Sequence, residues 1–195
     1  PRHIVLAPGD TYVDATVVFD PRDSKLTVEG AGMGQTRLYG GRRIEGWRRE
    51  GDRFLAADIG SGADPWSFRV LVVGDEIRPR ARFPETGRLE HETVFPVRWM
   101  STAGGGWERK PTDAELTTMR LKAGDLAAGT RLDGAEITVY HMWDESTVGV
   151  KGYDQASRLV TLASPCGHPP GAFGVQTYVI WNTAEGMTRP GQWYL

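Results

Sequence analysis

The chain has little cysteine: Cys166 stands alone among 195 residues, so no internal disulfide framework can hold the fold together. It also lacks any run of about 18 apolar residues, the length that a membrane-spanning helix requires. A formal net charge of −2 creates no long-range field to attract nucleic acid or an acidic membrane. We therefore expect neither nucleic acid nor a membrane as a partner.

Groups that could hold a metal or a cofactor are equally sparse. The four histidines are scattered along the chain without the spacing of metal ligands. Cys166 and His168 lie two residues apart in a Pro-rich loop, but two ligands cannot close a tetrahedral zinc site. No phosphate-binding glycine motif and no nucleophile elbow is present. We expect no metal and no cofactor, and a structural role for Cys166.

Turn-forming and aromatic residues, in contrast, are abundant. The chain contains 25 Gly, 12 Pro and 7 Trp, while 39% of its residues are hydrophobic and 25% are charged. The hydrophobic and charged fractions are ordinary for a globular protein. Frequent turns together with many aromatic residues favour short strands over long helices. The composition predicts an all-β protein.

The first part of the chain alternates short apolar runs with turns. Runs rich in β-branched residues recur about ten residues apart, each closed by Gly, Pro or Asp; they cover residues 3–6, 15–19, 26–30 and 36–41. This spacing, with no helix between the runs, is typical of the rungs of a parallel β-helix. A meander in a β-sandwich would give a similar pattern.

The later part of the chain predicts antiparallel strands. Gly74-Asp75 separates two strand-like runs and is a hairpin signal. Residues 135–143 alternate, which places Ile137, Val139 and His141 on one face, as in an antiparallel strand with one face in water. Further strands are expected at residues 146–150, 158–162 and 176–181.

One segment carries the signals of a helix. Thr112 followed by Glu115 three residues later forms a capping box, which marks a helix start. Met119 and Leu121 would contribute to its apolar side, and Gly124 would end it.

Four motifs in a fixed order resemble a family of right-handed parallel β-helix proteins. Residues 39–47 (YGGRRIEGW) are similar to the segment that leaves the family's first rungs, and residues 72–84 resemble its Arg-rich hairpin. Residues 143–148 match a strand pair of the family. Asn182 and the PGQWYL of residues 190–195 match another conserved pattern, with Gln192 where the family has Glu and Gly74-Asp75 where it has Asn-Gly.

The resemblance implies a bacterial glycoside hydrolase of the pectate-lyase-like superfamily, with a β-sandwich inserted between early rungs. Residues 1–45 would then be β-helix rungs, and residues 46–195 would be the inserted antiparallel β-sandwich. The family's catalytic carboxylates lie on later rungs, so we expect them beyond Leu195. The chain opens at Pro1 and stops in what resembles a strand start, and we expect both ends to be cut.

Arginines alternate along one extended segment. Arg78, Arg80 and Arg82 would share a face, where their guanidinium groups could hold a uronic acid carboxylate. The alternative is a solvated or ion-paired sheet edge that blocks edge pairing. We take Arg80 and Arg82 as candidate substrate-binding residues.

Carboxylates beside an aromatic residue form the second candidate site for binding or cleaving a sugar. Glycoside hydrolysis needs two carboxyl groups about 5 to 10 Å apart. Asp144 and Glu145 follow Trp143, but neighbours on a strand point to opposite faces, so we assign no catalytic residue within the chain. Trp143 and Asp144 are retained as candidate substrate-binding residues, with a core position for Trp143 and a turn at 144–145 as the alternative. Three tryptophans in or near loops could likewise stack on sugars or simply pack: Trp66, Trp99 and Trp107.

These observations lead to two functional hypotheses. The first is the amino-terminal, accessory portion of a secreted or periplasmic polysaccharide-degrading glycoside hydrolase, which caps the β-helix and walls the substrate cleft. The second is a non-catalytic carbohydrate-binding or adhesion module of a β-helix surface protein or phage tail. A polysaccharide lyase is a third possibility, but no acidic cluster for Ca²⁺ is visible. In each case the partner is a polysaccharide or oligosaccharide.

Overall fold

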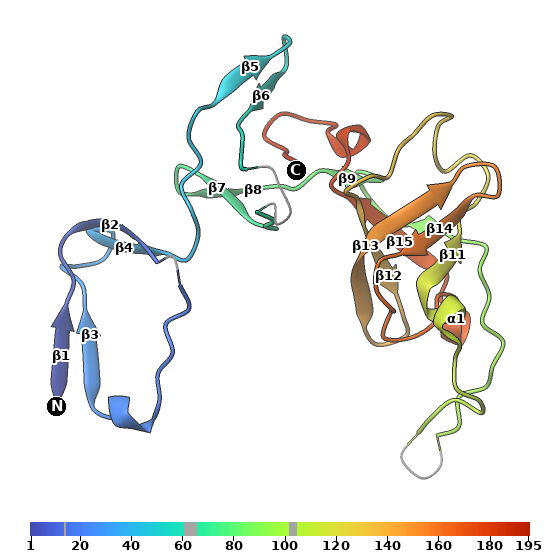
Figure 1. Ribbon diagram of the computed structural model, residues 1–195, viewed down its shortest axis with the longest axis horizontal. Helices are drawn as coiled ribbons and strands as arrows, with labels where there is room; N and C mark the ends of the chain where they lie inside the picture. Colours follow the sequence, from blue (N-terminus) through green and yellow to red (C-terminus); the bar gives the residue numbers. More distant parts are fainter. Residues whose placement is uncertain (14, 61–65, 102–104) are drawn as a thin grey trace. The chain divides into compact units, whose positions relative to one another are not determined.

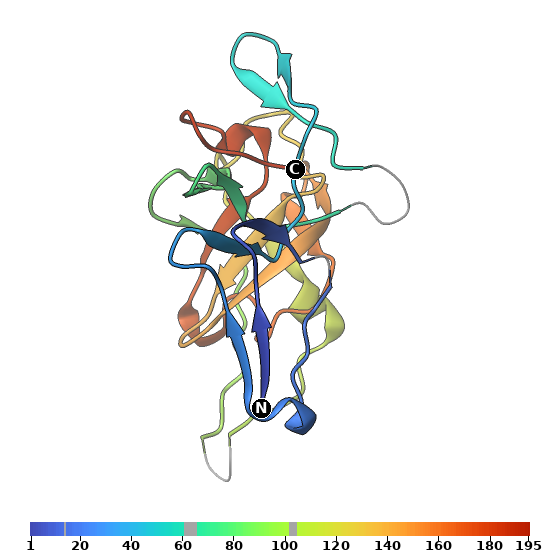
Figure 2. The ribbon, with the colours of Figure 1, turned by 90° about the vertical axis from the view of Figure 1, so that its left-hand side faces the viewer.

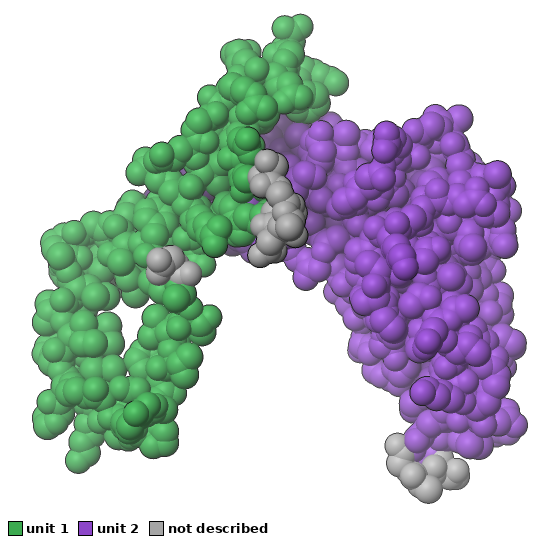
Figure 3. Space-filling model, viewed as in Figure 1, with its two compact units in different colours: residues 1–66 green, residues 67–195 purple. Residues whose placement is uncertain are grey.

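The structure is a computed structural model that describes residues 1–13, 15–60, 66–101 and 105–195. The chain divides into unit 1, residues 1–66, and unit 2, residues 67–195, which Figure 3 distinguishes by colour. Nearly all of the regular elements in these residues are strands, so the mostly-β composition predicted from the sequence is confirmed. The predicted domain boundary between residues 45 and 46 stays a prediction.

Unit 1 contains two parallel strand pairs and one hairpin. Its strands are β1 (Arg2–Val5), β2 (Gly9–Tyr12), β3 (Leu26–Glu29), β4 (Thr36–Tyr39), β5 (Arg48–Glu50) and β6 (Phe54–Ala56). Strand β1 pairs in parallel with β3, and β2 pairs in parallel with β4, while β5 and β6 form an antiparallel hairpin. The β1–β3 pair runs side by side in both ribbon views (Figures 1 and 2). None of the described side chains of unit 1 is buried.

The strand expected at residues 15–19 is wrong. The ladder partner of β4 is Gly9–Tyr12, and one further hydrogen bond, from the Val13 amide to the Tyr39 carbonyl, ends that ladder. Residues 16–19 have no strand structure, and Val18 is 76% exposed. An apolar β-branched run becomes a strand only where a neighbouring backbone accepts and donates its hydrogen bonds.

Unit 2 is built on one antiparallel sheet. Its strands are β7 (Leu71–Val73), β8 (Glu76–Arg78), β9 (Arg82–Phe83), β10 (Leu89–Glu90), β11 (Thr118–Arg120), β12 (Glu136–Tyr140), β13 (Glu145–Asp154), β14 (Leu159–Leu162) and β15 (Thr177–Trp181). The order in the main sheet is β10-β15-β12-β13-β14-β11, and β9 also pairs with β15. Strands β7 and β8 form the hairpin predicted at Gly74-Asp75.

The main sheet of unit 2 closes on itself. Directly after β10, His91 forms an antiparallel bridge with Leu121, which follows β11 at the other end of the strand order. The Glu92 amide also donates to the Arg120 carbonyl at 2.8 Å, and the Arg158 guanidinium binds the Glu92 carboxylate at 2.6 Å. Closure removes both free edges of the sheet, which would otherwise expose unpaired backbone groups.

Alternate residues of the closed sheet point inward and form the core. Ile137 and Val139 of β12, and His141 just after it, are buried as the alternation predicted, but the opposite face is not in water, because Thr138 is only 3% exposed. Strand β13 shifts register between Val150 and Gly152, so its first half pairs with β12 and its second half with β14. This β-bulge bends the strand from one side of the core to the other. The antiparallel pairing is as predicted, and the inserted β-sandwich stays a prediction.

The predicted helix is shorter than expected. Helix α1 (Asp113–Thr117) begins at the Thr112–Glu115 capping box, as predicted, but it ends at Thr117 instead of Gly124. Residues Thr118–Arg120 form β11 and pair with β14. Met119 and Leu121, both fully buried, are spaced as on a strand, so pairing within the sheet prevails over helix propagation.

We expect His91 to make unit 2 sensitive to acid. His91 is fully buried, and burial lowers its pKa to about 4 from the ordinary 6.5. Between these values the unfolded chain binds more protons than the folded one, so the free energy of unfolding falls as the pH is lowered from 6.5 to 4. The loss should be about 3 kcal/mol, measured by urea unfolding at several pH values. The variant His91→Leu should lose this slope, and an identical pH dependence in both proteins would contradict the assignment.

Candidate functional site

Unit 2 carries a cluster of aromatic rings drawn from three separate segments. Trp99 and Trp107 contact each other edge to face, with ring centroids 4.8 Å apart. Trp143 contacts Phe173 at 4.7 Å and His168 at 5.5 Å, and it lies 6.0 Å from Trp99. We call these five residues the aromatic cluster. Edge-to-face contacts of this kind stabilise by roughly 1 kcal/mol each beyond the area they bury.

Backbone pairing positions two of the three segments. Trp99 and Trp107 form an antiparallel bridge, supported by the Met100 amide donating to the Gly106 carbonyl at 2.7 Å. Trp143 lies in the tight connection between β12 and β13, where the His141 amide donates to the Asp144 carbonyl at 2.9 Å. Trp99 and Trp107 are therefore held by a bridge and Trp143 by a tight turn, and not by their side chains alone.

Close backbone packing positions the third segment, the loop that carries His168 and Phe173. Gly171 has φ +82°, and a Cβ atom there would lie 2.2 Å from the Thr93 carbonyl oxygen. Phe173 itself adopts a left-handed backbone conformation with φ 59°, which is rare for an aromatic residue. The loop thus reaches the cluster only because glycine permits the backbone contact with Thr93.

Polar groups lie next to the rings. The Ser146 hydroxyl is 3.1 Å from His141 Nε2 and accepts from the Gly167 amide at 2.9 Å. Burial lowers the pKa of His141, so its ring is neutral at neutral pH. His141 Nδ1 is buried and has no hydrogen-bond partner among the described residues, so no carboxylate orients the ring as in a Ser-His-Asp triad. His168 Nε2 lies 3.9 Å from an Asp144 oxygen.

Trp143 and Asp144, two of the predicted site residues, therefore belong to one place, but Trp143 is not a core residue. It is 58% exposed, although three rings contact it. Two histidines that the sequence did not single out also lie here: His141 and His168 are far apart in the sequence, yet their ring centroids are 5.5 Å apart. No local spacing signalled this pair, because the two residues come from different segments of the chain.

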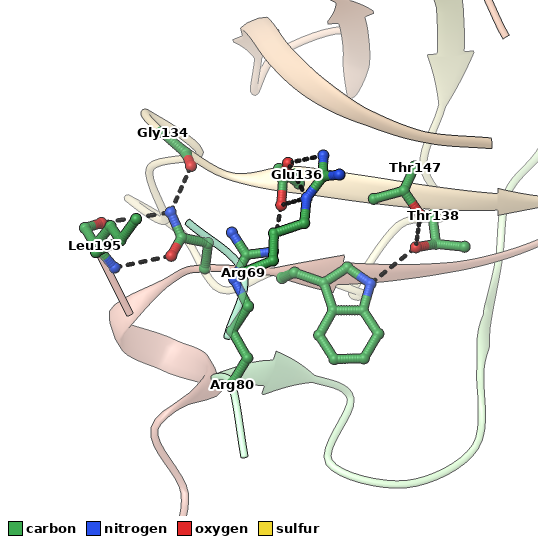
Figure 4. Close-up of polar contacts among 9 residues, drawn as sticks. Arg69, Arg80, Gly134, Glu136, Thr138, Thr147 and Leu195 are labelled. Atoms are coloured by element: carbon green, nitrogen blue, oxygen red, sulfur yellow. Dashed lines mark hydrogen bonds and ion pairs between the residues drawn. The ribbon is translucent and has the colours of Figure 1, made fainter. Parts of the chain in front are cut away.

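Arg80 lies elsewhere and already has partners. Its guanidinium binds the Glu136 carboxylate, which Arg69 also binds (Figure 4), and it lies 5.8 Å from the centre of the Trp193 ring. Only 11% of the Arg80 side chain and 16% of the Glu136 side chain are exposed. Glu136 begins β12, whereas Trp143 follows its end, so the two groups of predicted residues lie at opposite ends of that strand.

Arg82 is likewise engaged with its own surroundings. It donates to the carbonyl groups of Pro84 and Gly87, both at 2.5 Å, and its guanidinium lies 5.6 Å from the centre of the Trp181 ring. These contacts hold the turn between β9 and β10. The binding role predicted for Arg80 and Arg82 stays a prediction, and the structure gives both residues internal partners.

Residues of the motifs that suggested the family resemblance lie together near the start of β12, the end at which Glu136 lies. The Ala81 amide donates to the Trp193 carbonyl at 2.7 Å, and the Trp193 indole donates to the Arg78 carbonyl at 3.0 Å. Asn182 donates to the Gly134 carbonyl and accepts from the Leu195 amide at 2.8 Å (Figure 4). The motif residues thus join the last residues of the chain to the sheet.

In the described part of the chain we find no metal site, no reactive thiol and no membrane-spanning helix. Its His, Cys, Asp and Glu side chains form no group of three or more that could hold a metal ion. Cys166 is buried, and burial raises the pKa of its thiol to about 11, so it is protonated at neutral pH. Helix α1 has only five residues, and no helix within the described ranges is long and apolar enough to cross a membrane.

Among solved structures, a protein described as "Glycoside hydrolase" shares this fold. The match has a TM-score of 0.67, covers 98% of this chain and has 19% sequence identity. The chain spans about a third of the length of that protein, 33%. No protein-family model and no curated protein matches the chain. At this identity the likeness shows the fold alone: the chain has a fold that occurs within a glycoside hydrolase.

We expect Gly171→Ala to destabilise unit 2 by about 3 kcal/mol or more, because the new methyl group must displace the Thr93 carbonyl while the backbone stays left-handed. Gly129→Ala is a matched control, since Gly129 has the same φ of +82° but nothing within 4 Å of the added carbon. The control should cost only about 1–2 kcal/mol. Equal losses in urea unfolding would show that the contact with Thr93 does not constrain the loop.

We expect Glu136→Gln to cost about 3 kcal/mol of unfolding free energy, because it leaves the mostly buried Arg80 cation without its carboxylate. Arg131→Ala is the control, because the Arg131–Asp133 ion pair is solvent-exposed. The unfolding midpoint of this variant should equal that of the unchanged protein. The double variant Glu136→Gln/Arg80→Met should recover part of the loss. If the losses of unfolding free energy in Glu136→Gln and in Arg80→Met simply add up in the double variant, the pairing is ruled out.

Proposed function

We propose that this chain is the amino-terminal, accessory portion of a polysaccharide-degrading glycoside hydrolase. In this proposal residues 1–45 begin a right-handed parallel β-helix, and the rest of the chain caps the helix and forms one wall of the substrate cleft. The observation that carries the proposal is the fold match, which spans 98% of this chain and only a third of a glycoside hydrolase. A secreted or periplasmic location follows from a polysaccharide substrate.

The two parallel ladders of unit 1 support the β-helix. Arg2 pairs with Leu26 and Gly9 with Thr36, so one turn takes about 25 residues, within the range of solenoid repeats. The rings of Tyr12 and Tyr39, partners in the second ladder, stack with centroids 5.1 Å apart. Such contacts between neighbouring turns are typical of a solenoid, in which each repeat packs on the next.

The exposure of unit 1 supports further turns beyond these two. A solenoid needs about three or more repeats to bury a continuous core. The two turns in unit 1 leave Ile4 and its partner Val28 each 47% exposed, and no described side chain of the unit is buried. Additional rungs stacked on these strands would cover such residues.

The carboxyl groups of the chain support an accessory role. A glycosidase needs a general acid whose pKa is raised, paired with a second carboxylate. Among the described residues, every carboxyl group with a displaced pKa is displaced downward, as at Glu115, where the Arg109 guanidinium lowers it to about 2. In this proposal the catalytic carboxylates come from later rungs.

The aromatic cluster favours a second candidate, a non-catalytic carbohydrate-binding or adhesion module of a β-helix surface protein or phage tail. An exposed indole such as Trp143 suits sugar binding whether or not hydrolysis follows. The two candidates differ in what the longer protein does: only the first requires that glycosidic bonds be cleaved.

We expect the 195-residue chain alone to release no product from xylan, pectin or alginate, and the longer protein that contains it to release reducing ends. Reducing ends and unsaturated products should be followed together, because a lyase forms the latter. Hydrolysis by the chain alone would contradict the accessory role. A folded longer protein that binds polysaccharide without cleaving it would favour the adhesion module.

A further inference from the structure

The aromatic cluster leaves one ring in a position that packing alone does not explain. Trp143 is 58% exposed, whereas Phe95, which contacts Trp107 of the cluster with ring centroids 5.0 Å apart, is only 5% exposed. Indole rings contribute more to stability when their large apolar surface is buried. Trp143 is instead braced by Trp99, His168 and Phe173 and keeps most of its surface in water.

The three ring contacts preorganise the exposed Trp143 indole for binding. Its connection between β12 and β13 is short, and three ring contacts restrict its rotamers, so little conformational entropy remains to be lost on binding. A rigid, flat, apolar ring matches the C–H face of a pyranose, which can be removed from water by stacking. A ligand with one apolar face and a polar rim therefore fits this position.

The negative charge beside the Trp143 ring favours neutral sugars over acidic ones. Asp144, whose side chain is 44% exposed, and the exposed Glu145 both follow Trp143 directly. Carboxylates accept hydrogen bonds from sugar hydroxyls but repel the carboxylate of a uronic acid. Of the arginines in unit 2, Arg88 lies over the Tyr140 ring at 3.4 Å, Arg109 is ion-paired with Glu115, and Arg80, paired with Glu136, lies at the other end of β12.

We propose that Trp143 and Asp144 form a binding platform for neutral oligosaccharides: the indole stacks on one sugar ring, and the Asp144 carboxylate accepts from its hydroxyl groups. His168, 3.9 Å from Asp144, positions that carboxylate without touching the sugar. This inference rests on the proposed function, and it deepens it by naming uncharged sugars as the class that unit 2 recognises.

The test is a titration of the 195-residue chain with three oligosaccharides of equal length: a xylo-oligosaccharide, a gluco-oligosaccharide and an oligogalacturonide, followed by calorimetry or NMR. We expect saturable binding of at least one neutral ligand and weaker binding of the oligogalacturonide. Trp143→Ala should weaken neutral binding at least about tenfold. Trp47→Ala, which removes a tryptophan that is 47% exposed in unit 1, should leave it unchanged.

Asp144→Asn provides a second reading, because it removes the charge and keeps the shape. The variant should bind the neutral oligosaccharide several-fold more weakly. The ratio between its affinities for the neutral oligosaccharide and for the oligogalacturonide should also fall. Absence of neutral binding, tighter binding of the oligogalacturonide, or unchanged affinity in both variants would overturn the platform. None of these outcomes bears on hydrolysis by the longer protein, so failure here is distinguishable from failure of the proposed function.

Discussion

Closure of the antiparallel sheet is the constraint on which unit 2 depends. A few backbone hydrogen bonds around His91 and Leu121 join the two ends of the strand order and leave the main sheet without a free edge. The segment that carries Trp99 and Trp107 follows His91 directly in the chain, so this junction also fixes where that segment begins. The aromatic cluster therefore depends on a junction that it does not itself contain.

The two ends of β12 serve different purposes. At its start, Glu136 joins Arg69 and Arg80, and neighbouring contacts tie the last residues of the chain to the sheet. At its end, the chain turns through Trp143 and Asp144, which remain exposed. Buried ion pairs favour a specific arrangement more than they favour stability, and exposed aromatic rings favour binding. The structure thus places a mostly buried ion pair at one end of the strand and an exposed aromatic residue beyond the other.

The two units manage their strand edges in opposite ways. Unit 2 closes its main sheet, whereas unit 1 stacks two short parallel ladders and buries none of its described side chains. Parallel strands are normally covered on both faces, because their side chains are apolar on both. The two open ladders leave Ile4 and its partner Val28 each 47% exposed.

Local patterns in the sequence determined the strands from β12 onward, the hairpin at Gly74-Asp75 and the capping box at Thr112, because side-chain alternation, turn chemistry and capping act within a few residues. Tertiary structure alone decided the rest. It ended α1 early at β11, gave Arg80 a partner 56 residues away, and brought His168 beside His141. Such contacts depend on strand register and sheet closure, which bring distant segments together and leave no trace in local spacing.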